Sequence, residues 1–163
     1  MTTKQPAKVM ILCVVSSKGD VLTHFFVPTK NVNSTTYCEV LTKKVIPWMK
    51  DKSNGKSFVF RQDLATAHTA KKTVQLLQKA KIKFWPKDVW LSNSPDLNPL
   101  GYYFWERIVG KACLKPHNSI ITLKKSIKQA IDPVDKANII HAVSRFCSRV
   151  EAVIANEGGH IEG

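Results

Sequence analysis

The chain has 163 residues, 44% of them hydrophobic and 23% charged, which is typical of a globular domain and excludes a disordered or fibrous chain. Lysine and arginine number 25 against 12 acidic residues, so the net charge is +13. This balance favours a polyanionic partner such as nucleic acid, although it also fits an ordinary basic surface.

The first elements are predicted to be a β-hairpin followed by a helix. Apolar, β-branched residues fill Lys8–Val15 and Val21–Val27, and the polar turn Ser16–Asp20 separates them. Asn33 and Ser34 can cap the helix, which starts near Thr35. Its apolar stripe follows helical spacing at Tyr37, Val40, Leu41, Val45 and Trp48.

The middle of the chain alternates short strands with a helix. Ser57–Arg61 and Ile82–Trp85 are short apolar runs that predict strands, and about Thr69–Lys79 between them predicts a helix. Pro86–Pro99 contains three prolines and is predicted to be mostly extended loop.

Helices dominate the remainder, with predicted spans of Leu100–Cys113, Ile120–Ile131 and a long helix from Pro133 to about Asn156. The order of elements favours an α/β fold with a helical C-terminus. We expect residues 1–163 to form a single domain.

The cysteines and the apolar runs indicate an intracellular protein without a membrane partner. None of the four cysteines lies in a Cys-x-x-Cys pair, so all four are interpreted as reduced core residues. The apolar run Val9–Val15 is too short to span a membrane, and we recognise no signal peptide.

Two segments could carry chemistry. Asp63 ends a predicted buried strand, and ligands of open α/β sheets bind beyond such ends. The alternative is that Asp63 or Thr66 only caps the next helix and that His68 is structural. In Ser94–Leu100 two prolines clamp a loop, where Asp96 and Asn98 can form Asx turns. The alternative is that this loop is only a rigid connection into the next helix.

Together these segments resemble the catalytic core of the mariner superfamily of transposases. The resemblance rests on QDxAxAHTAKKT at Gln62–Thr73 and SPDLNPLxY at Ser94–Tyr102, where x marks Leu64, Thr66 and Gly101, which depart from the family pattern. It extends to Val9–Gly19, Val45–Trp48 and Gly158–Glu162, and so covers nearly the whole chain. The resemblance implies an RNase H-like fold, an Asp-Asp-Asp/Glu triad that holds Mg²⁺ or Mn²⁺, and cut-and-paste transposition of DNA.

By this resemblance the triad is incomplete. Two-metal phosphoryl transfer needs carboxylates that hold both ions. Asp63 matches the second acid, but Gly101, with 37 residues between it and Asp63, occupies the position of the third. A shorter family spacing would place the third acid at Asn98, which is neutral. Glu106 should face elsewhere if the helix advances about 100° per residue. We therefore expect doubtful metal binding and no strand cleavage by this chain alone.

The resemblance also predicts what the fold lacks. The first acid belongs to a strand that would precede the hairpin, and the helix-turn-helix modules that read transposon ends belong further upstream; we recognise neither. We expect an RNase H-like mixed sheet flanked by helices but lacking its first, central strand. Unpaired strand edges would then promote aggregation or marginal stability.

DNA is the expected partner, a homodimer is an additional expectation, and the nucleus is the expected location. The candidate DNA-contacting residues are His68, Lys71, Lys72, Lys111, Lys115, Lys124, Lys125 and Lys128. The lysines could hold the DNA backbone without reading sequence, or could simply be a solvated helix face. Two alternatives to an inactive DNA-binding fragment stay open: a domesticated regulatory protein, and an active subunit completed by a partner chain.

Overall fold

The computed structural model describes residues 7–28, 31–89, 98, 100–155 and 157. The chain forms two compact units. Unit 1 comprises residues 1–30 and 94–163, and unit 2 comprises residues 31–93. Within these described ranges, no helix is both long enough and apolar enough to cross a membrane.

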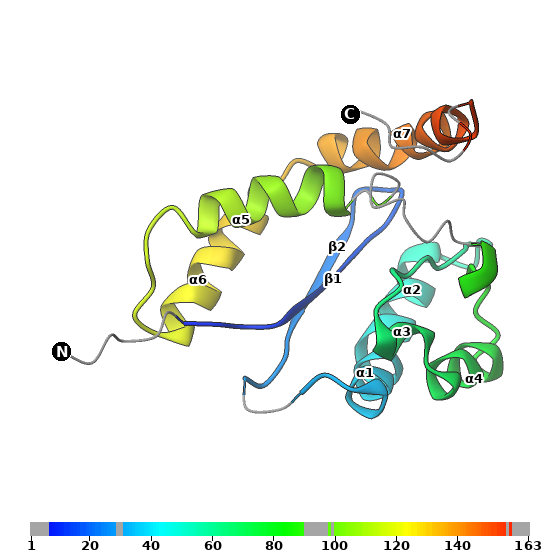
Figure 1. Ribbon diagram of the computed structural model, residues 1–163, viewed down its shortest axis with the longest axis horizontal. Coiled ribbons are helices and arrows are strands. Elements are labelled where there is room, and N and C mark those ends of the chain that lie inside the picture. The colour runs from blue at the N-terminus through cyan, green and yellow to red at the C-terminus, as the bar shows by residue number, and fades with distance from the viewer. Residues whose placement is uncertain (1–6, 29–30, 90–97, 99, 156, 158–163) are drawn as a thin grey trace. The chain divides into compact units, whose positions relative to one another are not determined.

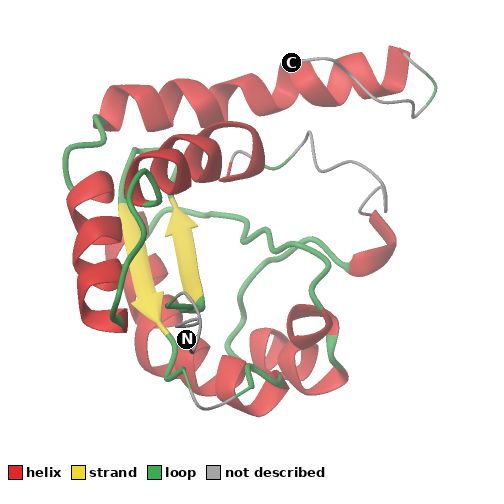
Figure 2. Ribbon diagram, turned by 60° about the vertical axis from the view of Figure 1, so that its left-hand side comes forward, coloured by secondary structure: helices red, strands yellow, loops and turns green. Residues whose placement is uncertain are grey.

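Unit 1 contains the predicted β-hairpin, which the structure confirms. Strands β1 (Ile11–Val15) and β2 (Val21–Phe25) pair antiparallel, with Cys13 opposite Thr23. The turn closes where the Gly19 amide donates to the Ser16 carbonyl at 3.0 Å, and Gly19 has φ +86°. Figure 2 shows the two strands side by side.

The helices of unit 1 also follow the prediction, with shifted bounds for the first and last of them. They are α5 (Glu106–Ala112), α6 (Ile120–Ile131) and α7 (Lys136–Ala155). Ser119 caps α6 by accepting the Thr122 amide at 3.2 Å. The turn before α5, η4 (Leu100–Trp105), is a π-helix, which the sequence analysis did not anticipate. Figure 1 shows α5 and α6 beside the hairpin.

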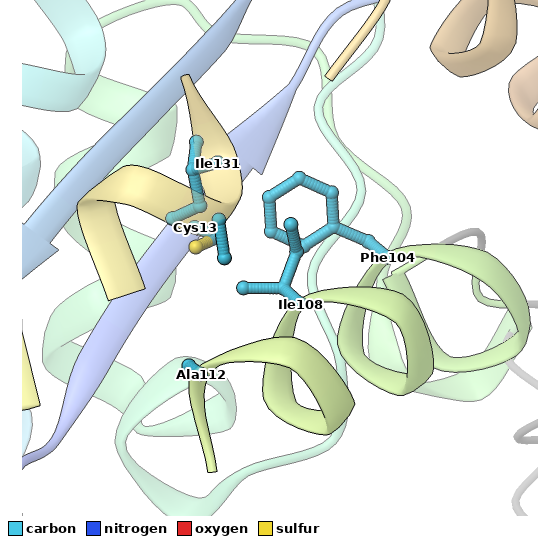
Figure 3. Close-up of a cluster of buried hydrophobic side chains, with 6 residues drawn as sticks. Cys13, Phe104, Ile108, Ala112 and Ile131 are labelled. Carbon is cyan, nitrogen blue, oxygen red and sulfur yellow. The ribbon is translucent and has the colours of Figure 1, made fainter. Parts of the chain in front are cut away.

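The core of unit 1 lies between the hairpin and these helices. Phe104 and Ile108 pack toward Cys13 of β1 and Ile131 of α6, as Figure 3 shows. Burial of the Cys13 thiol raises its pKa to about 12, so this cysteine is an inert core residue, as predicted. Cys113 is exposed, so its assignment to the core was wrong.

Unit 2 is built on one long helical stretch: α1 (Ser34–Val40), the π-helical turn η1 (Leu41–Val45) and α2 (Ile46–Ser53). Asn33 caps it by accepting the Thr36 amide at 2.9 Å. The predicted stripe is buried at its first four positions, but Met49 replaces Trp48 in the core. The π turn holds more residues per turn than an α-helix, and so shifts the phase of the stripe.

The rest of unit 2 contains α3 (Thr66–Thr69), α4 (Lys71–Lys79) and the 3₁₀ turn η2 (Lys87–Val89). The helix predicted from Thr69 therefore begins at Lys71, after a separate single turn. Cys38 of α1 is buried and its Sγ lies 3.6 Å from Oγ1 of Thr73, which supports its assignment to the core.

The strands predicted at Ser57–Arg61 and Ile82–Trp85 are reduced to one parallel bridge between Phe60 and Phe84. The Phe60 amide donates to the Lys83 carbonyl at 2.7 Å, and the Trp85 amide donates to the Phe60 carbonyl at 3.2 Å. Over the part of the chain that the structure describes, the sheet is thus smaller than the mixed sheet that we predicted.

Candidate functional site

Asp63 lies in the loop between the Phe60 bridge and α3, with its side chain 54% exposed. One carboxylate oxygen accepts the Ala65 amide at 2.9 Å, which closes an Asx turn. The N-cap of α3 is Ala65, so neither Asp63 nor Thr66 caps that helix. The turn fixes the carboxylate and leaves it open to solvent.

His68 of α3 is the partner of this carboxylate. Its Nδ1 lies 2.5 Å from Oδ1 of Asp63, and its side chain is 15% exposed. The interaction with His68 lowers the pKa of Asp63; partial burial opposes this shift, and the Ala65 amide adds to it. Asp63 is therefore held in its charged form at neutral pH.

Tyr37 of α1 lies behind His68, and the sequence analysis assigned it only to the core. The two rings lie 4.2 Å apart at 31°, and the Tyr37 hydroxyl donates to Oε1 of Gln62 at 2.6 Å. Burial raises the pKa of Tyr37, and the nearby Asp63 charge adds to the shift. A buried tyrosine hydroxyl needs a hydrogen-bond partner. A tyrosine within an apolar stripe was therefore the only signal in the sequence for this role.

Asp63 also borders a small pocket of unit 2 with a volume of about 30 Å³. Such a volume suits water molecules and not a nucleobase. The pocket is lined by Gln62, Asp63, Leu64, His68, Thr69, Val74, Phe84, Trp85, Pro86 and Lys87.

Gly101 lies exposed in the π turn η4 of unit 1. Asn98 precedes it and accepts the Leu100 amide at 3.0 Å, which confirms an Asx turn at Asn98. Asp96 lies outside the described residues. Because π turns bond residue i to residue i+5, a residue five positions on lies near the same side of the helix. The expectation that Glu106 faces away from Gly101 assumed α-helical geometry throughout, which η4 does not have, so it stays a prediction; both residues are exposed.

The described residues do not make up a divalent-ion site. Among them, no group of three or more His, Cys, Asp or Glu side chains could hold a metal. Asp63 offers one exposed carboxylate that already contacts His68, and Gly101 has no ligand atom. No catalytic step through a metal follows from these residues.

The predicted DNA-contacting lysines are distributed over both units. In unit 2, Lys71 and Lys72 start α4, and Nζ of Lys72 donates to Oγ1 of Thr35 at 3.1 Å. In unit 1, Nζ of Lys124 and Lys128 lie 5.5 and 6.0 Å from the Phe25 ring centroid. These two lysines therefore also pack on the hairpin. The remaining predicted lysines are exposed: Lys111, Lys115 and Lys125.

Comparison with known proteins finds transposases. No family model matches the chain. The Tc3 transposase of Caenorhabditis elegans is 30% identical over 138 residues, which cover 83% of this chain and 40% of that transposase. The catalytic domain of Mos1 mariner transposase superposes with a TM-score of 0.78 at 18% identity, over 94% of this chain and 76% of that one.

The chain is similar to mariner-superfamily transposases, to Tc3 in sequence and to Mos1 in fold. Its mixed α/β fold matches the RNase H-like catalytic domain of Mos1, as predicted. A Mos1 paired-end complex with Mg superposes with a TM-score of 0.83 at 19% identity, over 99% of this chain and 50% of that one. The mariner-type chain thus spans about 40% of the length of the curated relative that it matches.

Proposed function

We propose that this mariner-type chain binds DNA through its basic residues and does not cut DNA by itself. The observation that carries the proposal is Gly101, a residue without ligand atoms at the position where the family resemblance expects the third acid. Asp63, which matches the second acid, is charged and exposed but is engaged by His68.

The DNA-binding part is supported by charge and by relatives. The net charge of +13 favours association with a polyanion, because bound lysines release counterions from the DNA backbone. Mos1 transposase is known in a paired-end complex with a transposon end. Exposed Lys111, Lys115 and Lys125 of unit 1 are the groups that we assign to backbone contacts.

The metal-binding part of the family resemblance is weaker for this chain. Mos1 structures are known with Mg and with Mn. In this chain Asp63 is the carboxylate that would contact such an ion, and we propose that its affinity for Mg²⁺ or Mn²⁺ is low because Gly101 stands where the family resemblance expects the third acid.

The test of DNA binding is its salt dependence. Replacing Lys111, Lys115 and Lys125 with glutamine should make the slope of log K against log salt less steep by about 2–3. A matched variant with glutamine at exposed Lys43, Lys50 and Lys56 should change the slope less. Fluorescence anisotropy with a labelled duplex measures both slopes, and a salt-independent affinity would contradict the proposal.

A second candidate function is strand cleavage by a complete subunit, and one observation favours it. The π turn η4 covers Gly101 and ends just before Glu106, so the two residues are not separated by the α-helical spacing on which their separation was predicted. If Glu106 serves as the missing acid, Mn²⁺-dependent nicking should be lost in Glu106→Gln and kept in Glu151→Gln, an exposed acid of α7.

A nuclear location and a homodimer complete the proposal. Both are suggested by a DNA partner and by the paired-end assemblies of Mos1. Microscopy of the tagged chain tests the first, and light scattering with and without DNA tests the second.

A further inference from the structure

The parallel bridge of unit 2 has an outer face that the proposed function does not use. Side chains alternate between the two sides of an extended segment. Phe60 and Ile82 are 8% and 6% exposed and form the inner side, whereas Val59 is 55% exposed on the other side. By the same alternation, the outer face consists of Val59, Arg61, Lys83 and Trp85.

The outer face combines an aromatic ring with cations. The guanidinium of Arg61 lies 5.8 Å from the centroid of the Trp85 ring. Lys83 is exposed, and its Nζ donates to Oγ of Ser57 at 3.4 Å. Lys87, two residues after Trp85, is exposed as well. Trp85 is half-buried, so its ring is supported by the fold without being sealed inside it.

This surface is continuous with the candidate site. Trp85 and Lys87 line the same pocket as Asp63 and His68. A molecule that contacted the Trp85 ring at the rim of this pocket would lie beside the Asp63 carboxylate.

The chemistry of the outer face selects one class of ligand. Aromatic rings flanked by cations bind single-stranded nucleic acid, because a base stacks on the ring and its phosphates meet the positive charges. A duplex keeps its bases stacked inside and cannot offer one to Trp85. An acidic peptide would satisfy Arg61 and Lys83 but would have no flat group to place on the indole.

We propose that the outer face binds unpaired nucleotides of a DNA strand, with one base on Trp85 and the adjoining phosphates at Arg61 and Lys83. This inference rests on the proposed DNA-binding function. It adds that unit 2 binds unpaired DNA and names the residues that make the contact. It assigns to unit 2 a contact with unpaired nucleotides that is separate from the backbone contacts of the unit 1 lysines.

The test compares binding of labelled oligo(dT) and of a duplex of equal length to the full chain. Trp85→Leu should weaken oligo(dT) binding about tenfold and leave duplex binding within about twofold. Trp85→Phe keeps an aromatic ring and should retain most of the affinity. Trp48→Leu, at a half-buried tryptophan of α2 in the same unit, is the matched control and should change neither affinity.

Arg61→Gln combined with Lys83→Gln provides a second variant that leaves the indole in place. It should weaken oligo(dT) binding and reduce its salt dependence. The inference would be overturned if Trp85→Leu weakened oligo(dT) and duplex binding equally. It would also be overturned if neither Trp85→Leu nor the double cation variant weakened oligo(dT) binding. If the wild-type chain bound only the duplex, the inference would be overturned and the proposed DNA binding would be supported. If it bound neither DNA form, both the inference and the proposed function would be contradicted.

Discussion

At the scale of single residues, two interactions fix the Asp63 carboxylate before any ligand arrives. The Ala65 amide closes the turn and His68 contacts the same oxygen. A carboxyl whose pKa is lower in the folded chain stabilises the fold above its unfolded pKa, and this stabilisation is lost as the pH falls through the folded pKa. Because Asp63 is about half exposed, solvent screens the interaction and its contribution to stability is small.

The arrangement predicts the effect of removing the histidine. In His68→Ala, the pKa of Asp63 should rise toward its ordinary value of 3.8, because the largest cause of its depression is gone. Carbon-13 NMR titration of the aspartate side chains measures the shift. His141→Ala, at an exposed histidine of α7 in unit 1, is the control. An unchanged Asp63 pKa in His68→Ala would show that the contact does not persist in solution.

Sequence reasoning could identify Asp63 and His68 because the motif that carries the resemblance contains both. It could not identify Tyr37 as their support, because Tyr37 and Gln62 are 25 residues apart and only the fold brings them together. Gly101 needed no structure, since the absence of a side chain is a property of the sequence itself. The position of Glu106 did need one, because periodicity assumes α-helical geometry.

At the scale of elements, the hairpin turn is held against the start of α7. A Cβ at Gly19 would lie 2.7 Å from the Lys136 carbonyl oxygen, and φ is +86° there. Nζ of Lys136 also lies 2.9 Å from Oδ1 of Asp20 in the same turn. The turn therefore depends both on a left-handed backbone and on a close backbone approach.

A pair of glycine substitutions separates these two requirements. Gly19→Ala should lower the free energy of unfolding by about 2–4 kcal/mol, because backbone strain and overlap with Lys136 add together. Gly55→Ala, with φ +76° and no atom within 4 Å, should cost about 1 kcal/mol from the backbone alone. Urea unfolding measures both, and equal costs would contradict the packing of the turn on α7.

The apolar core offers a second comparison. Leu77 of α4 is 0% exposed and Leu114 after α5 is 80% exposed. Leu77→Ala should lower the free energy of unfolding by about 2–5 kcal/mol, because it leaves a cavity. Leu114→Ala should change it by less than about 0.5 kcal/mol. A similar effect of the two substitutions on urea unfolding would mean that α4 is not packed as described.

Helices were easier to predict than strands, for a physical reason. Amphipathic stripes over Ile120–Ile131 repeat for several turns, so the pattern is strong and the predicted bounds agree with α6. Ser57–Arg61 and Ile82–Trp85 are runs of four or five residues whose pairing depends on distant partners. They gave one bridge where strands were predicted. The π turns η1 and η4 have no signature in a pattern that assumes 3.6 residues per turn.

At the scale of the whole molecule, the family and the RNase H-like fold followed from two spaced motifs, and local pattern alone gave only an α/β class. The comparisons support the likeness to mariner-superfamily transposases through Tc3 and confirm the fold through Mos1. The size of the sheet did not follow from the sequence, because strand pairing is a long-range property. Whether the chain cuts DNA depends on acids that must meet in space, and a fold shared with Mos1 does not by itself supply them.

The most direct test of the central claim is nicking of supercoiled plasmid in Mn²⁺ by the wild-type chain and by Asp63→Ala, at protein concentrations that saturate binding. The account predicts that both proteins bind the plasmid and that neither nicks it above the background without protein. Nicking by the wild type that disappears in Asp63→Ala would contradict it, because Asp63 would then be serving a working active site.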